Sequence, residues 1–111
     1  MHIELQTNHH IENNVGLGHH VNDVIRKTLQ SYRDHITRVD VHLSDVNSKR
    51  TSKQDKRCVV EFHISGLRPM AVSAKADTVH RVLDRAVKKL RHAVVSAYEK
   101  QQRYHRIVLQ G

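Results

Sequence analysis

Hydrophobic and polar residues alternate along four stretches of the chain. Alternation with a period of two puts every second side chain on the same face, so each stretch predicts a β-strand with one buried face. In the second stretch, for example, Val39, Val41 and Leu43 face one way, and the residues between them are polar. The predicted strands cover residues 2–6, 36–46, 57–65 and 70–76.

A first helix is predicted between the first two strands. Apolar residues recur at helical spacing from Val21 to Tyr32, which indicates an amphipathic helix over residues 17–33. The segment NNVGLG at 13–18 holds two glycines, and glycine is unfavourable within a helix, so we expect this segment to be a loop leading into the helix.

A second helix is predicted over residues 78–101, where apolar residues follow a 3.6-residue period. Asp77 or Thr78 is expected to cap its first turn, because either side chain can accept hydrogen bonds from the free amides there. A helix of this length is long for so small a domain, so its last turns are expected to extend beyond the sheet. The pattern of residues 103–111 predicts no helix or strand. We therefore expect a flexible, basic tail after a domain that spans residues 1–102.

This order of elements, β-α-β-β-β-α, predicts an α+β fold. The first helix separates the first two strands, which can therefore pair in parallel through a right-handed crossover. The later strands follow one another through short connections and are expected to pair antiparallel, the first of these connections being a basic loop at 47–56. The result is a four-stranded mixed sheet with both helices packed on one face. The opposite face is expected to be wet, with the polar residues Glu4, Gln6, Arg38, Asp40, His42, Glu61 and His63.

The composition points to a polyanionic partner. The chain has 111 residues, enough for one domain, and a net charge of +8 with a pI near 10.1. Nucleic acid is the commonest such partner; an anionic membrane surface and simple solubility are the alternatives. The sequence has neither a transmembrane run nor the start of a signal peptide, so we expect a cytoplasmic protein. The single cysteine, Cys58, alternates inward and is expected to be a buried apolar residue.

Basic residues concentrate on the second predicted helix. Arg81, Arg85, Lys88 and His92 are spaced to share one helix face, flanked by Lys89 and Arg91, and such a single-signed face suits RNA phosphates. A solubilising face is the alternative. Aromatic residues are few, which favours recognition of backbone and shape over base reading. Further candidate RNA-binding residues are Arg26 and Lys27 on the first helix and Lys56 and Arg57 beside the loop.

The sequence favours a protein that is not an enzyme. It shows no nucleophile arrangement, no paired carboxylates and no phosphate-binding glycine loop. The pairs His9-His10 and His19-His20 lack a metal-ligand spacing, so we expect neither a structural metal nor a cofactor.

Three segments of the sequence together resemble one known family. They are ITRVDVHLSD at 36–45, DKRCVVEFHISGLRPMAV at 55–72 and ADTVHRVLDRAVKKLRHAV at 76–94. These segments resemble the ribosome hibernation-promoting factors, whose relatives are also called ribosome-associated inhibitors or sigma-54 modulation proteins. The resemblance is looser at MHIELQT (1–7) and IRKTLQSY (25–32), and in all it covers nearly all of residues 1 to about 98.

The resemblance implies the same element order, similar in layout to a double-stranded-RNA-binding domain. It also implies binding to the small (30S) ribosomal subunit through 16S rRNA, occlusion of the mRNA and tRNA channel, and inhibition of translation in stress or stationary phase. It implies no small-molecule substrate and no membrane. The residues matching the family's contacts are Arg26, Lys27, Lys56, Arg57, Arg85, Lys88, Lys89 and Arg91.

The chain departs from the family pattern at three points. Thr28 and Ser31 stand where relatives often have lysine, and the glycine-rich NNVGLG at 13–18 replaces a better helix start. We also expect the chain to correspond to the short form that lacks a second dimerisation domain. Two alternatives to the hibernation function stay open: a general RNA- or DNA-binding module, and a regulatory protein that binds another protein.

Overall fold

A computed structural model of the chain describes residues 1–8, 11, 14–45 and 55–110, and for residues 109 and 110 the backbone alone. The element order β-α-β-β-β-α is confirmed, with one additional 3₁₀ turn, η1, after the first helix. The elements are β1 His2–Thr7, α1 Val15–Thr28, η1 Gln30–Tyr32, β2 Ile36–Asp45, β3 Lys56–Ile64, β4 Met70–Ala76 and α2 Val79–Gln110.

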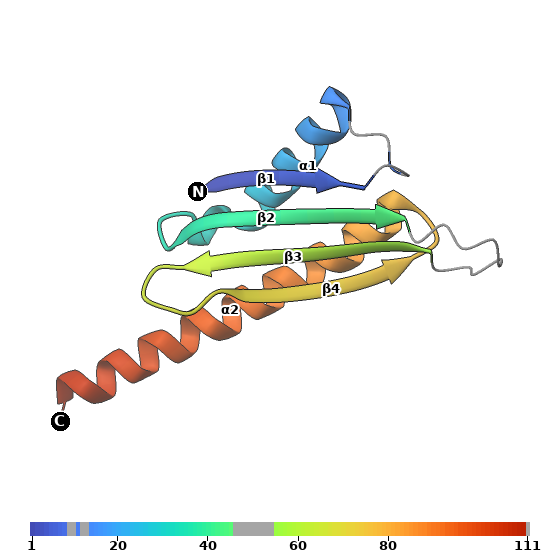
Figure 1. The fold of residues 1–111 in the computed structure, drawn as a ribbon. Helices are drawn as coiled ribbons and strands as arrows, with labels where there is room; N and C mark the ends of the chain where they lie inside the picture. Colours follow the sequence, from blue (N-terminus) through green and yellow to red (C-terminus); the bar gives the residue numbers. More distant parts are fainter. Residues whose placement is uncertain (9–10, 12–13, 46–54, 111) are drawn as a thin grey trace.

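The four strands form one mixed sheet in the order β1-β2-β3-β4 (Figure 1). β1 pairs in parallel with β2, Ile3 lying opposite Val39, as the crossover through α1 requires. The other two pairs are antiparallel, which confirms the predicted sheet. β1 and β4 are consequently the two edge strands.

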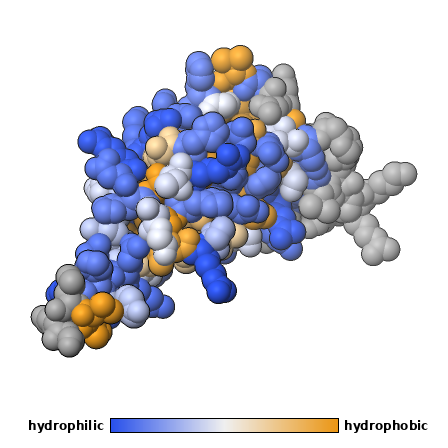
Figure 2. Space-filling model, turned by 60° about the vertical axis from the view of Figure 1, so that its left-hand side comes forward, coloured by the Kyte–Doolittle hydropathy of each residue, from blue (hydrophilic) through white to orange (hydrophobic). Residues whose placement is uncertain are grey.

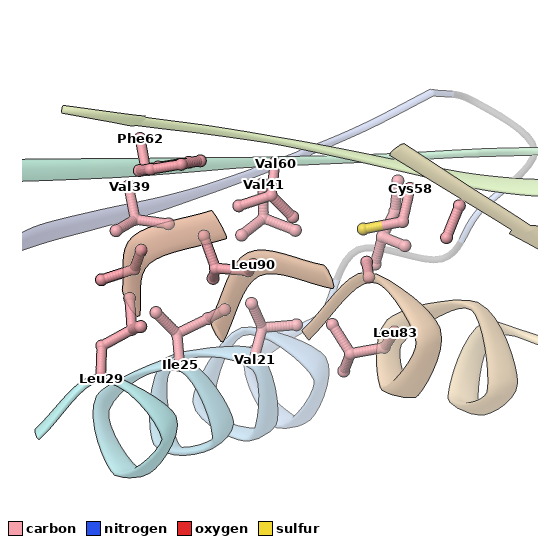
Figure 3. Close-up of a cluster of buried hydrophobic side chains, with 14 of the residues drawn as sticks. Val21, Ile25, Leu29, Val39, Val41, Cys58, Val60, Phe62, Leu83 and Leu90 are labelled. Carbon is pink, nitrogen blue, oxygen red and sulfur yellow. The ribbon is translucent and has the colours of Figure 1, made fainter. Parts of the chain in front are cut away.

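Both helices pack on one face of the sheet and enclose the core. Figure 3 shows Val39, Val41, Val60 and Phe62 pointing from the strands toward the helices. The helices contribute the buried residues Val21, Ile25, Leu83 and Leu90, and Leu29 directly after α1 adds to them. Cys58 is buried in the same layer, as predicted.

The prediction for the first helix was wrong at both ends. α1 begins at Val15 and includes both glycines, because Asn14 caps it: its side-chain oxygen accepts a hydrogen bond from the Leu17 amide at 2.8 Å. A good cap offsets the cost of glycine in the first turn. The helix ends at Thr28, and the apolar residues beyond it continue their spacing through η1.

The start of α2 follows the prediction, but its end does not. The Thr78 hydroxyl accepts a hydrogen bond from the Arg81 amide at 3.1 Å, which confirms the cap. The helix continues to Gln110, through most of the segment expected to be a tail, and projects beyond the sheet (Figure 1). Adding residues to an existing helix is favourable, since only the first turn carries the cost of nucleation. The flexibility of this segment stays a prediction.

The face of the sheet opposite the helices is polar, but Asp40 on it is not wet. Asp40 is 8 % exposed, and the Arg38 guanidinium covers it with a contact of 2.8 Å. Arg38 also reaches Glu4 on β1 at 2.8 Å. Cross-strand ion pairing therefore withdraws this carboxylate from solvent, an effect that polar alternation cannot reveal.

Candidate nucleic-acid interface

A basic groove runs between the edge strand β4 and helix α2. We call it the β4 groove. It consists of two adjoining hollows of 550 and 590 Å³, which share Ser73, Lys88 and Lys89. The complete lining is Val72, Ser73, Ala74, Lys75, Arg85, Lys88, Lys89, His92 and Ala93. The groove thus gathers four of the six predicted α2 residues.

Two of these cations are held in place by the free edge of the sheet. Arg85 donates from Nη1 to the Lys75 carbonyl at 2.7 Å, and Lys89 donates from Nζ to the Ser73 carbonyl at 2.8 Å. An edge strand exposes carbonyls that pair with no neighbouring strand. The bonds from Arg85 and Lys89 satisfy two of these carbonyls, so they are not free to pair with a strand of another molecule. Because a carbonyl does not neutralise a cation, both groups keep their full charge at fixed positions along the groove.

The remaining α2 residues differ in how far their charge is compensated. Lys88, Arg91 and His92 are exposed, and within the described ranges none has an acidic partner. Arg81 pairs with Asp77 at 3.1 Å, but both side chains are well exposed, so this i,i+4 pair is weak. A phosphate can displace such a partner at little cost.

The predicted α1 residues lie elsewhere. Arg26 and Lys27 border a hollow of 350 Å³ together with Met1, Arg33 and the acidic Asp23. Met1 precedes β1, at the opposite edge of the sheet from β4, so the structure does not bring these residues into the β4 groove. Arg26 is also held by Asn22, with Nε donating to Oδ1 at 2.7 Å.

Between these two basic groups the helices contact each other. The rings of His20 and His80 are 5.2 Å apart, and those of Tyr32 and Tyr98 are 5.3 Å apart. The helix layer is therefore continuous, with basic residues along both of its margins and not in one patch. A polyanion that contacts both groups must cross the outer surface of the helices.

The two loop-edge candidates are not part of either group. Lys56 lies between Asp45 at 3.0 Å and Asp55 at 3.2 Å, and its hydrogen bond to Asp45 raises its pKa. Its charge is therefore already compensated within the fold. Arg57 is exposed and alternates with the buried Cys58, which puts it on the face of the sheet away from the helices. Lys49, Arg50 and Lys53 lie outside the described residues.

Sequence reasoning missed the part that β4 plays in the groove. Helical spacing identified Arg85 and Lys89 as basic residues, but it did not indicate that the Lys75 and Ser73 carbonyls hold them. Arg33, a third basic residue of the first predicted helix, lies beside Arg26 and Lys27. The four-strand order made an edge position for β4 foreseeable, whereas the approach of α2 to that edge depends on packing.

A metal or catalytic site does not emerge from the described part of the chain. No three His, Cys, Asp or Glu side chains gather there as metal ligands. Burial raises the pKa of the Cys58 thiol to about 12, which makes it a poor nucleophile. The independence of folding from metal stays a prediction.

The family model for sigma 54 modulation protein / S30EA ribosomal protein matches residues 6–102. The chain belongs to this family. It is a family of ribosome-associated factors, and not a known class of enzymes. Among curated proteins, no sequence matches the chain.

Solved structures share the fold of this family member. The N-terminal domain of Protein Y from Thermus thermophilus is 21 % identical, with a TM-score of 0.68 over 85 % of this chain and 96 % of that one. A ribosomal subunit interface protein from Coxiella burnetii is 19 % identical, with a TM-score of 0.63 over 90 % of this chain and 99 % of that one. No helix among the described residues is both long and apolar enough to cross a membrane.

Proposed function

We propose that this protein is a hibernation factor that binds the small ribosomal subunit through phosphates of 16S rRNA. Bound there, it blocks the mRNA and tRNA channel and inhibits translation in stress or stationary phase, in the cytoplasm. The observation that carries the proposal is the β4 groove, in which Arg85, Lys88 and Lys89 line one surface and no acidic residue is part of the lining. The relatives named for the ribosomal subunit interface support the choice of partner.

The groove suits a phosphate backbone. Arg85 and Lys89 are four residues apart, which is about 6 Å along a helix and close to the step between phosphates in an RNA strand. Their anchoring to β4 means that little side-chain entropy remains to be lost on binding. Lys88 and His92 add donors one turn apart on the adjacent helix face.

Base reading is not supported. Stacking on bases needs exposed aromatic rings. In this protein Phe62 is fully buried, and Tyr32 and Tyr98 pack against each other. Tyr104 is exposed, but it lies on the projecting end of α2 and is not part of the β4 groove. The groove is lined by basic, small and aliphatic side chains. Recognition therefore relies on backbone charge and RNA shape.

The test compares two double variants that change the net charge equally. Arg85→Glu with Lys88→Glu reverses two charges in the β4 groove. Arg103→Glu with Arg106→Glu reverses two exposed charges on the projecting end of α2, outside the β4 groove, and is the matched control. Each protein is mixed with purified small subunits, sedimented through a sucrose gradient, and added to an in vitro translation reaction.

We expect the groove variant to lose both sedimentation with the subunit and inhibition of translation, while the control keeps both. Equal behaviour of the two variants would refute the assignment of the groove. Equal affinity of the wild type for small subunits and for unrelated duplex RNA would favour the alternative, a general nucleic-acid-binding module.

A further inference from the structure

A second groove, distinct from the β4 groove, lies where α2 leaves the sheet. We call it the α2 overhang groove. It has a volume of 720 Å³ and lies between the β3–β4 turn and residues 93–105 of the helix. Its lining is Gly66, Leu67, Arg68, Met70, Ala93, Ser96, Ala97, Lys100, Gln101, Tyr104 and His105.

The apolar face of α2 continues past the sheet that covers its first part. Val94 and Ala97 are buried against the core. Seven and eleven residues after Ala97, on the same helix face, Tyr104 is 71 % and Val108 is 57 % exposed. Ile107 beside them is 68 % exposed. Figure 2 shows apolar surface at this projecting end, next to hydrophilic surface. Several large apolar side chains gathered in one exposed patch mark an interaction site more often than isolated ones do.

The base of the groove is fixed in position. Gln101 donates from Nε2 to the Ser65 carbonyl at 2.9 Å, which ties the helix to the β3–β4 turn. Gly66 adopts a φ of 84° in that turn, and Leu67 after it is 37 % exposed on the groove wall. One wall is therefore a rigid turn and the other an amphipathic helix, an arrangement that receives a peptide segment between them.

The charge around the groove is positive. Arg68 and Lys100 line it, and Arg103 and Arg106 follow on the helix. Between residues 99 and 108 the only acidic residue is Glu99. A second copy of the chain docked here would bring like charges together, and RNA makes no use of the aliphatic side chains. An apolar peptide segment bordered by carboxylates would match both the exposed apolar side chains of the groove and the positive charge around them.

We infer that the α2 overhang groove binds an amphipathic peptide segment of a partner protein, with apolar residues on one side and acidic residues at its borders. The apolar side of the peptide covers Tyr104 in the groove and the exposed Val108 one turn beyond it, and its carboxylates pair with Arg68 and Lys100. This inference is independent of the proposed RNA site, because the two grooves share no residue other than Ala93.

The test uses a display library of random linear peptides, selected on the whole protein at moderate salt. Two groove variants probe the two features: Tyr104→Ser with Val108→Ser removes apolar surface, and Arg68→Glu with Lys100→Glu reverses charge. Arg85→Glu with Lys88→Glu in the β4 groove is the control with the same change in net charge as the second variant. Circular dichroism melts establish that all the variants are folded.

We expect enriched peptides to combine apolar residues at regular spacing with Asp or Glu. A synthetic copy of the strongest peptide should bind each groove variant about tenfold more weakly than the wild type, while the control keeps its affinity. Failure to enrich any peptide overturns the inference, as does binding lost in the control but kept in the groove variants.

Two further outcomes would assign the groove to another occupant. A doubled mass in sedimentation equilibrium that Tyr104→Ser with Val108→Ser abolishes would identify a second copy. A loss of small-subunit binding by the same variant, as large as that of the β4 groove variant, would identify RNA. Either result overturns the peptide assignment.

Discussion

Leu90 and Lys88 lie two residues apart on α2 but have different roles: Leu90 belongs to the core, and Lys88 lines the β4 groove. Leu90 is fully buried between the sheet and α1, as Figure 3 shows, whereas Lys88 is exposed beside the β4 groove. A single helix thus keeps its folding residues and its binding residues on separate faces, and substitutions can address one without the other.

Leu90→Ala is expected to lower the free energy of unfolding by roughly 2–5 kcal/mol, because it removes buried methyl groups and leaves a cavity. Lys88→Ala should change it by less than about 0.5 kcal/mol, as is usual for exposed positions. Equilibrium unfolding in urea measures both. Similar losses in the two variants would contradict the burial pattern of α2.

Asp40 gives the protein a specific dependence on acid pH. The Arg38 guanidinium is hydrogen-bonded to this carboxylate and lowers its pKa, against burial, which acts to raise it. A carboxylate with a lowered folded-state pKa stabilises the fold above its ordinary pKa near 4, and this stability is lost as the pH falls through the lowered value. Arg38→Gln should therefore flatten, or reverse, the loss of stability below pH about 4. Urea unfolding across that range measures it, with Arg68→Gln as control; parallel curves for wild type and Arg38→Gln would refute the assignment.

At the scale of single elements, two glycines have opposite roles. Gly18 lies within α1, and a Cβ added there meets no atom within 4 Å. Gly66 lies in the β3–β4 turn with a φ of 84°, where an added Cβ would lie 3.1 Å from the Gln101 amide. α1 therefore tolerates its glycine, while the turn requires its own.

We expect Gly18→Ala to stabilise the protein by about 1 kcal/mol, since alanine loses less backbone entropy in a helix. Gly66→Ala should destabilise it by about 1 kcal/mol or more, because an L-residue is strained in the left-handed region. Thermal melts of the two variants test whether the first stabilises the protein and the second destabilises it. A destabilised Gly18→Ala would mean that α1 needs its glycine for a reason other than helix geometry.

At the scale of the whole molecule, net charge and charge placement have to be separated. The charge of +8 attracts any polyanion, whereas the β4 groove offers fixed contacts. The salt dependence of binding distinguishes attraction by net charge from contact with the groove. Each phosphate that the protein contacts releases counterions and adds a little under one unit to the slope of log affinity against log salt concentration. Arg85→Glu with Lys88→Glu should make the slope shallower by about 1.5–2 units. Arg103→Glu with Arg106→Glu, outside the groove, should leave it nearly unchanged. Sedimentation with small subunits at several salt concentrations measures the slope, and equal slopes would indicate attraction by net charge alone.

The sequence by itself determined the elements and their order. Alternation gave the four strands within one or two residues, because a half-buried strand must expose every second side chain. Helical spacing identified the basic face of α2, because residues three and four positions apart lie on the same face of a helix. Boundaries were harder: the Asn14 cap, which starts α1 before its glycines, and the extension of α2 to Gln110 are set by local hydrogen bonds and helix propagation, to which hydrophobic periodicity is insensitive.

Only the tertiary structure decided which basic residues share a surface. Residues on one helix share a face by geometry alone, so Arg85, Lys88 and Lys89 could be grouped from their spacing. Arg26 and Arg57 were grouped with them by charge, yet the packing of α1 and the pleat of β3 put them at other margins of the molecule. The contact of Arg85 and Lys89 with β4 likewise depends on where the edge of the sheet lies relative to the helix. That relation arises between elements distant in the chain, and no local pattern encodes it.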